Sequence, residues 1–255
     1  MTMKWIRKDV LAGKVVFGTF LNLGSHITAE IAAQAGFDWV LLDLEHGAGE
    51  RTEVLRQLQA VEAGGATPVV RLGWNDRPLM KRILDLGALG IMVPFINTAE
   101  AAREATTSLQ YPPQGERGTA VFCRATRYGV EFDRYFAEAN EELLSVVQIE
   151  TLEAVENAEA IAAVERVDVL FVGPMDLSVS MGMPRQFDHP EFREKLLAVV
   201  SACKKHGKAA GILAPNAEVA AQFLADGFTF VAAGSDGAVV ASGLASIAQA
   251  LRSTR

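Results

Sequence analysis

Charged side chains stand at or just after the ends of several apolar segments in this sequence. His46 follows Glu45 directly after the apolar segment 39–44, where an imidazole can move a proton near neutral pH. Arg71 lies inside a second apolar segment, and a buried guanidinium there needs an anionic partner. That partner is either a structural acid, Asp43 or Glu45, or the oxyanion that develops on a bound substrate. These residue types point to acid–base and charge-stabilising chemistry.

Two carboxylates follow further apolar segments and suit a metal ion. Glu150 follows the segment 144–149, which also contains Gln148, and Asp176 follows the segment 167–172. Mg, Mn or Co accepts two carboxylates and keeps positions open for water and ligand oxygens. The alternative is that both acids cap helices, since a carboxylate at a helix start accepts backbone N–H bonds. Because polar groups recur at one segment end after another, we favour metal binding.

The elements that must position these side chains repeat in a regular order. Short apolar segments are each followed by a stretch with helical spacing, such as Leu55, Leu58 and Val61. Strands without polar alternation are typical of a parallel sheet buried on both faces. Strand then helix, about eight times over roughly 250 residues, indicates an α/β fold of the (β/α)8 TIM barrel type. The expected strands are 15–23, 39–44, 68–72, 90–96, 144–149, 167–172, 209–213 and 228–232.

We interpret residues 1–255 as a single barrel domain rather than a doubly wound open sheet. The open sheet also alternates strands and helices, but its usual G-x-G-x-x-G signature is replaced by LNLGSH at 21–26. Two connections, 111–140 and 173–190, are longer than a barrel needs, and long connections are usually functional or disordered. In a barrel of this type the chemistry lies at the C-terminal ends of the strands, so the polar groups would share one face.

The composition favours a small diffusible ligand over a macromolecular one. A formal net charge of −7 opposes the large basic footprint that nucleic acid requires. No apolar run reaches the roughly 18 residues of a membrane span, and the charged N-terminal region does not resemble a signal peptide. The two cysteines, Cys123 and Cys203, are too few for a disulfide framework. We therefore expect a soluble, cytoplasmic protein that binds neither nucleic acid nor membrane.

Several short motifs together resemble one known family. They are FDW at 37–39, DLEH at 43–46, WND at 74–76, YPP at 111–113 with RG at 117–118, QIET at 148–151 and GPMDLS at 173–178. In this order, over essentially the whole chain, the sequence resembles the HpcH/HpaI family of class II pyruvate aldolases. The set of motifs is far more specific than any one of them.

The resemblance implies a divalent metal, Mg, Mn or Co, and no organic cofactor. Glu150 and Asp176 would ligate the metal, with Gln148 close to it and to the substrate. Arg71 would hold the keto oxygen and stabilise the pyruvate enolate. The implied substrates are a small 2-oxo acid and an aldehyde, and the implied assembly is a homo-oligomer, a hexamer.

Further site residues come from the same resemblance. His46 would be the acid/base, acting through water and oriented by Asp85 from the third helix. Many relatives have Ala where Met175 stands, so a narrower pocket here leaves the size of the donor open. The implied substrate-binding residues also include Gly173, Pro174, Met175, Asp176 and Leu213, with Asp43 and Arg124 as possible subunit contacts or supports.

The expected reaction is reversible retro-aldol cleavage of a 4-hydroxy-2-oxo acid to pyruvate, or an analogue such as hydroxypyruvate, plus an aldehyde. An aldolase that works through a Schiff base needs a lysine inside the barrel or at a strand's C-terminal end. The lysines instead precede the barrel, lie in helical stretches or, like Lys208, precede a strand. If the chain is an aldolase, a metal must therefore stabilise the enolate.

Two other functions stay open from the sequence. One is a metal-dependent acyl-CoA lyase of the citramalyl-CoA or malyl-CoA type, although no basic cluster for the CoA phosphates stands out. The other is a barrel that binds a ligand without turning it over. The polar residues at the strand ends argue against this second alternative.

Overall fold

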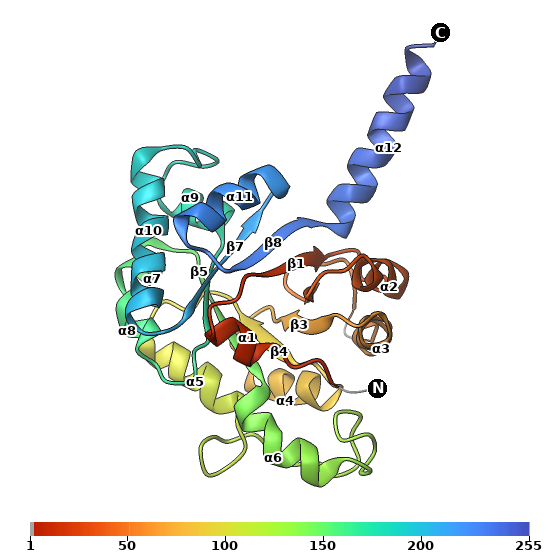
Figure 1. Ribbon diagram of the computed structural model, residues 1–255, viewed down its shortest axis with the longest axis vertical. Coiled ribbons are helices and arrows are strands. Elements are labelled where there is room, and N and C mark those ends of the chain that lie inside the picture. The colour runs from red at the N-terminus through yellow and green to blue at the C-terminus, as the bar shows by residue number, and fades with distance from the viewer. Residues whose placement is uncertain (1–2, 51, 255) are drawn as a thin grey trace.

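Eight parallel strands close into one barrel in the computed structural model, which describes residues 3–50 and 52–254 (Figure 1). Neighbouring strands follow chain order all the way round, and the last strand pairs with the first. The strands are β1 Val16–Leu21, β2 Trp39–Asp43, β3 Thr67–Arg71, β4 Gly90–Val93, β5 Leu144–Ile149, β6 Val169–Val172, β7 Ala209–Ala214 and β8 Phe230–Ser235. The predicted single-domain (β/α)8 barrel is confirmed.

Helices alternate with the strands and form the outer layer. They are α1 Arg7–Leu11, α2 His26–Gln34, α3 Val54–Gly64, α4 Arg77–Asp85, α5 Ala99–Leu109, α6 Phe132–Glu142, α7 Leu152–Glu156, α8 Ala158–Ala162, α9 Pro174–Ser180, α10 Pro190–Lys205, α11 Ala217–Asp226 and α12 Asp236–Arg252. Their starts follow local chemistry: the Asp76 carboxylate accepts from the N–H of Leu79 at the start of α4. The apolar face of α4, which includes Met80 and Ile83, packs into the core.

Both connections expected to be long loops contain helices. α6 begins within the predicted connection 111–140 and ends just beyond it, and it buries Tyr135 and Ala139 against the barrel. α9 lies within the predicted connection 173–190 and starts with Pro174 in its first turn. Prolines and glycines at 111–118 favour turns, and the sequence prediction therefore assigned no helix to the residues that follow them.

The barrel interior is filled by every second residue of the strands. Trp39 stacks on Phe230 with ring centroids 4.1 Å apart, and both contact Phe171 edge-on. Ile6, just before α1, and Val10, within it, join this inner cluster and close the N-terminal end of the barrel. The interior is therefore a packed core, and the polar side chains that could do chemistry lie beyond it at the C-terminal ends of the strands.

The last helix departs from this arrangement. α12 projects away from the barrel, and none of its described residues is buried (Figure 1). The other long helices each bury a row of apolar side chains against the strands. Within the described part of the chain, no helix has the length and apolar character needed to cross a membrane.

Candidate active site

The inward alternation of the strands places the predicted residues at the C-terminal end of the barrel. On β2 the inward positions run from Trp39 to Asp43, and on β3 they end at Arg71, which pairs in register with Asp43. On β5 the same alternation continues to Gln148, and Glu150 follows at the next inward position. A side-chain period of two thus brings residues from three strands to one layer.

Arg71 is buried and surrounded by acids. Its Nε and Nη2 donate to the two carboxylate oxygens of Asp43 at 2.9 and 2.7 Å. Its Nη1 lies 3.0 Å from Glu45 Oε2 and 3.5 Å from Gln148 Oε1. The Phe20 ring lies under the guanidinium, with 5.3 Å between Cζ and the ring centroid. Both acids that the sequence suggested as partners of Arg71 are therefore in contact with it.

Burial affects Asp43 and Glu45 differently. For Asp43, burial acts to raise the pKa, but the hydrogen bonds and charge of Arg71 outweigh it and bring the pKa below the usual value. For Glu45, burial raises the pKa, the charges of Asp43 and Asp176 add to this, and Arg71 and His46 oppose it. Asp43 is thus a deprotonated partner that anchors Arg71, whereas burial favours the protonated form of Glu45.

Glu150 is a carboxylate whose pKa is strongly raised. Its Oε1 accepts from the backbone N–H of Phe95 at 2.7 Å, and its Oε2 accepts from Gln148 Nε2 at 2.7 Å. Burial, together with the charges of Glu45 and Asp176, raises the pKa of Glu150 to about 7 despite the Phe95 hydrogen bond. A positive charge beside these acids would offset both the cost of burying the Glu150 carboxylate and its repulsion from Glu45 and Asp176.

Gly173 and Asp176 border this carboxylate from the next strand. A Cβ at Gly173 would lie 2.9 Å from Glu150 Oε2 and 3.5 Å from Gln148 Nε2, so a side chain there would displace the carboxylate. Asp176 lies in the first turn of α9, next to Met175, which is exposed. The structure therefore brings the predicted pair of carboxylates, Glu150 and Asp176, to one side of the barrel mouth.

Helix capping does not account for these two acids. α7 is capped by Thr151, whose side chain accepts from the N–H of Ala154, so Glu150 is not used there. The N-cap of α9 is Gly173, and no side-chain cap hydrogen bond is found at that helix start within the described residues. The alternative that the sequence left open is thus not what the structure shows.

The residues present fit a divalent cation. Glu150 and Asp176 supply carboxylate oxygens, and Glu45 Oε2 is buried without an aligned hydrogen-bond donor among the described residues. Over residues 3–50 and 52–254, no group of three or more His, Cys, Asp or Glu is arranged as a complete metal site. The donor set is thus open, with two carboxylates and an amide, and it leaves positions for a chelating ligand.

His46 and Asp85 are not brought together within one chain. His46 lies beyond the C-terminal end of β2, with a largely exposed side chain and Nε2 3.7 Å from Glu45 Oε1. Asp85 ends α4, shortly before the start of β4, and its Oδ1 accepts from Arg117 Nη2 at 2.9 Å. Strands and helices run in opposite directions in this barrel, so the two residues lie at opposite ends. In this chain, Asp85 orients Arg117 and not His46.

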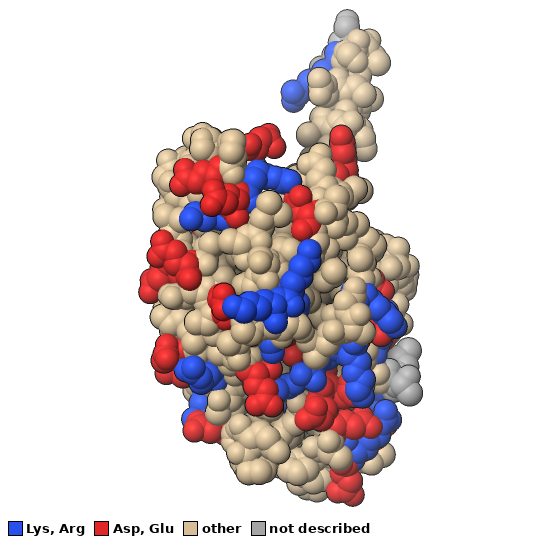
Figure 2. All heavy atoms as spheres, turned by 60° about the vertical axis from the view of Figure 1, so that its left-hand side comes forward, with Lys and Arg blue, Asp and Glu red and all other residues tan. Residues whose placement is uncertain are grey.

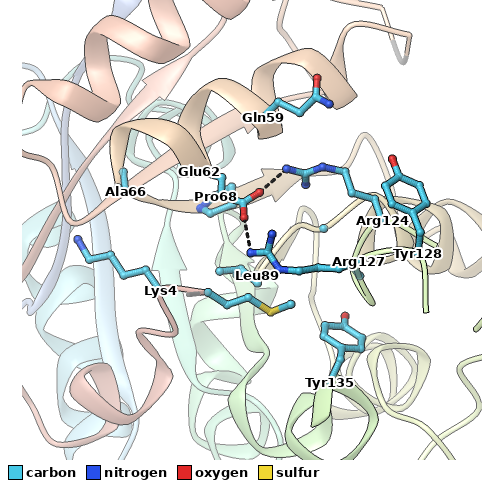
Figure 3. Close-up of a pocket in the computed structure, with 14 residues that line it drawn as sticks. Lys4, Gln59, Glu62, Ala66, Pro68, Leu89, Arg124, Arg127, Tyr128 and Tyr135 are labelled. Atoms are coloured by element: carbon cyan, nitrogen blue, oxygen red, sulfur yellow. Dashed lines mark hydrogen bonds and ion pairs between the residues drawn. The ribbon is translucent and has the colours of Figure 1, made fainter. Parts of the chain in front are cut away.

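Arg124 also lies far from the barrel mouth. It lines a cavity of about 240 Å³ beside the starts of β3 and β4, where Glu62 lies between Arg124 and Arg127 (Figure 3). Arg124 Nη1 donates to the backbone oxygen of Leu86 at 2.9 Å. This cavity is separate from the carboxylates described above. Within the chain, Arg124 supports the loop that carries it.

The remaining predicted contact, Leu213, faces the inner cluster near the end of β7.

Two residues that contribute to the site were not assigned to it from the sequence. Glu45 was visible in the motif at 43–46, but only as a possible partner of Arg71. Phe95 contributes a backbone N–H with φ of 52°, and no residue type signals such a role.

Comparisons with known proteins agree on one family. The HpcH/HpaI aldolase/citrate lyase family model matches residues 16–243. The chain is 41% identical to 5-keto-4-deoxy-D-glucarate aldolase of Klebsiella pneumoniae, over 94% of each chain. It is similar to a solved HpcH/HpaI aldolase/citrate lyase family protein of Burkholderia cenocepacia, with a TM-score of 0.92 and 33% identity over 97% and 98% of the two chains. A solved HpcH/HpaI aldolase of Desulfitobacterium hafniense also has a TM-score of 0.92, with 31% identity over 98% and 97%. The chain belongs to the HpcH/HpaI aldolase/citrate lyase family.

Proposed function

We propose that this chain is a carbon–carbon lyase, a divalent-metal-dependent aldolase that reversibly cleaves a 4-hydroxy-2-oxo acid. The products are pyruvate, or a close analogue such as hydroxypyruvate, and an aldehyde. The observation that carries the proposal is a single buried guanidinium, Arg71, among more acids than it can neutralise, next to Glu150. Family membership supplies the reaction class.

Similarity to 5-keto-4-deoxy-D-glucarate aldolases suggests the substrate class. Such a sugar acid carries a methylene next to its ketone and a hydroxyl one carbon further on, which is the pattern that retro-aldol cleavage requires. The polar barrel mouth suits a small, highly oxygenated acid. We propose a substrate of this type, with Mg, Mn or Co as the metal.

Glu150 and Asp176 would hold the metal, with Gln148 beside it. When bound, the metal supplies Lewis acidity that withdraws electron density from the 2-oxo group. Arg71 donates to the oxygen that gains negative charge as the carbon–carbon bond breaks, and Asp43 keeps the guanidinium in place. The first turn of α9, near Met175, has no side-chain cap among the described residues, and its backbone N–H groups would bind the substrate carboxylate.

His46 would move the proton. Its exposed imidazole at the barrel mouth can reach the 4-hydroxyl group through a water molecule and remove its proton during cleavage. The enolate released by cleavage then takes up a proton at carbon to give pyruvate, and in the reverse reaction the imidazole returns a proton to the new alkoxide. Because Asp85 lies at the other end of this barrel, Glu45 is the nearby acid that can influence the imidazole.

A substrate panel tests this proposal. Release of the 2-oxo acid product is measured with 5-keto-4-deoxy-D-glucarate, with other 4-hydroxy-2-oxo acids and with two thioesters, citramalyl-CoA, which would yield pyruvate, and malyl-CoA, which would yield glyoxylate, each in the presence of Mg, Mn or Co. We expect turnover of the free oxo acids and none of the thioesters. Cleavage of thioesters alone would make the chain an acyl-CoA lyase. Pyruvate binding by calorimetry without any turnover would make it a ligand-binding barrel.

We also propose a cytoplasmic homo-oligomer, with the hexamer that the family resemblance implies. Exposed apolar side chains support association, because a monomer rarely leaves large apolar patches in water. Phe122 is 82% exposed and Val130 is 86% exposed on the loop near Arg124. Arg124 itself is proposed as a residue that supports a subunit contact.

A further inference from the structure

Two exposed aromatic side chains stand at the C-terminal rim of the barrel. Trp74 lies in the loop after β3 and is 63% exposed, and Phe95 lies in the loop after β4 and is 39% exposed. Figure 2 shows acidic and basic groups interspersed over one face of the molecule, as on an ordinary solvated surface. Single apolar residues on such a surface are common, whereas two large rings together beside a polar site are typical of a surface that binds something.

The two rings are in contact, with centroids 5.9 Å apart and planes inclined by 33°. The loop that carries Trp74 is fixed, because Asn75 Nδ2 donates to the backbone oxygen of Ala101 at 3.3 Å and Asp76 caps α4. Phe95 has a φ of 52°, which a non-glycine residue adopts only where its surroundings hold it. The ring pair, Trp74 and Phe95, is therefore a fixed surface of the rim.

The ring pair lies beside two of the acids at the barrel mouth. A Cβ built on Gly73, the residue before Trp74, would lie 4.0 Å from Glu45 Cα. The backbone N–H of Phe95 donates to Glu150 Oε1 at 2.7 Å. A substrate chain that extends from these acids over β3 and β4 would therefore meet the two rings.

The order of the strands decides which half of the substrate meets the rings. In a closed barrel of eight strands in chain order, β6 lies opposite β2. The proposed function has the donor carboxylate at the start of α9, after β6, and the proton-transferring His46 after β2. The aldehyde half exchanges its proton with His46, so it lies on the β2 side of the mouth. The loop that carries Trp74 follows the next strand, β3.

We propose that the ring pair is the wall along which the aldehyde half of the substrate lies, and that Trp74 selects aldehydes with an aromatic or aliphatic substituent. The face of an aromatic ring binds other rings and C–H groups by stacking and by burial of apolar area. A hydroxylated chain can place only its C–H groups on the rings, so it gains less from them. A wall that is already fixed also loses little freedom when the aldehyde binds.

The inference rests on the proposed aldol reaction and adds the class of aldehyde to it. The two can fail separately, because exchange of the pyruvate methyl protons with deuterium oxide needs only the donor half of the site. Proton NMR follows this exchange with metal and pyruvate and without aldehyde. Wild-type protein with neither exchange nor cleavage would contradict the proposed reaction. Normal exchange together with an aldehyde preference that does not depend on Trp74 would contradict only the wall.

The test is a competition between benzaldehyde and D-glyceraldehyde for pyruvate in aldol addition, with the ratio of their kcat/KM values as the readout. Trp74→Ala should lower the ratio of benzaldehyde to glyceraldehyde roughly tenfold, mainly through a higher KM for benzaldehyde, because a stacked ring contact is lost. Trp74→Tyr keeps a ring and should keep most of the ratio. Trp74 is changed rather than Phe95, because a change at Phe95 would also disturb the hydrogen bond to Glu150.

The matched control is Phe136→Ala on α6. Phe136 is also 39% exposed and also contacts another ring, that of Phe132, with centroids 5.6 Å apart. This variant should keep the wild-type ratio. Pyruvate exchange and light scattering are measured on every variant, and both should match wild type. An unchanged ratio in Trp74→Ala, or the same loss in Phe136→Ala, would overturn the proposal. A loss of the ratio together with a lower mass would also overturn it, because the rings would then contact a second copy.

Discussion

The two ends of the barrel bury charge in opposite proportions. At the C-terminal end one guanidinium, Arg71, faces several acids, among them Asp43 and Glu45. At the N-terminal end one carboxylate, Asp168, is completely buried and faces several donors, with Arg7 Nε at 2.9 Å. The acids outnumber the bases at the C-terminal end, whereas the buried acid at the N-terminal end has several basic neighbours, although burial still raises its pKa.

Hydrogen bonding at the N-terminal end explains why we consider it structural. Asp168 Oδ2 accepts from the N–H of Ser145 at 2.9 Å. The charges of Arg166 and Lys208 also act on Asp168, and burial lowers the pKa of both bases. The carboxylate is satisfied by protein groups alone. At the C-terminal end the acids outnumber their donors, so a cation and a substrate complete the site.

The largest expected effect is on turnover. Arg71→Ala should lower kcat roughly a hundredfold or more with the fold retained, because the oxygen that gains charge loses its donor. Steady-state rates and circular dichroism measure the two properties. Arg7→Ala, which removes a guanidinium from the other end, is the control and should keep turnover per folded molecule. Near wild-type kcat in Arg71→Ala would remove this residue from the mechanism.

The same control variant should show the largest loss of stability. Arg7→Ala leaves the Asp168 carboxylate buried without its charged donor, and breaking a buried pair in this way costs about 3 to 5 kcal/mol. Urea denaturation measures the free energy of unfolding. An unchanged midpoint would show that the N-terminal network does not stabilise the barrel.

In metal-free protein, Glu150 should make the free energy of unfolding depend on pH. Its pKa is raised from 4.5 to about 7 on folding, so between these values the folded state keeps a proton that the unfolded state has lost. The contribution of Glu150 to the free energy of unfolding is therefore complete below its unfolded pKa, and it decreases as pH rises to about 7, by up to about 3 kcal/mol. Glu150→Gln should reduce this slope in denaturation series from pH 4.5 to 8 and leave the part that comes from Glu45 and Asp168, whose pKa values burial also raises, whereas the exposed Glu194→Gln should keep the full slope. An undiminished slope in Glu150→Gln would show that Glu150 is not its source.

The smallest effect concerns the size of the donor. Met175 is exposed on the first turn of α9, next to Asp176. Met175→Ala should widen the space beside the substrate carboxylate and raise kcat/KM for 2-oxobutanoate relative to pyruvate by roughly tenfold in aldol addition, since a methylene is worth about that much. Competition between the two donors measures the ratio. An unchanged ratio would show that Met175 does not limit donor size.

The barrel could be predicted because the residue patterns that produce it are local in the sequence. Apolar strands and helical spacing repeat along the chain, and the polar strand ends lie in order beside them. The predicted and observed strands differ mainly at their ends: the segment predicted at 90–96 is a strand only over Gly90–Val93. The grouping of Arg71, Gln148 and Glu150 follows from alternation along parallel strands.

Other features depend on groups that sequence spacing does not describe. The Phe95 N–H that binds Glu150 is a backbone donor in a positive-φ conformation. The pairing of His46 with Asp85 came from resemblance, and it fails within one chain because a helix returns its end to the opposite side of the barrel. The projection of α12 depends on the absence of a loop after Ser235, which apolar periodicity does not reveal.

The most direct test of the central claim is metal-dependent cleavage of 5-keto-4-deoxy-D-glucarate. Protein treated with EDTA and then desalted should release no pyruvate, and added Mg, Mn or Co should restore release. Glu150→Gln and Asp176→Asn should stay inactive at the same metal concentrations, while Asp168→Asn at the other end should respond like wild type per folded molecule. Full turnover after rigorous metal removal would contradict the account.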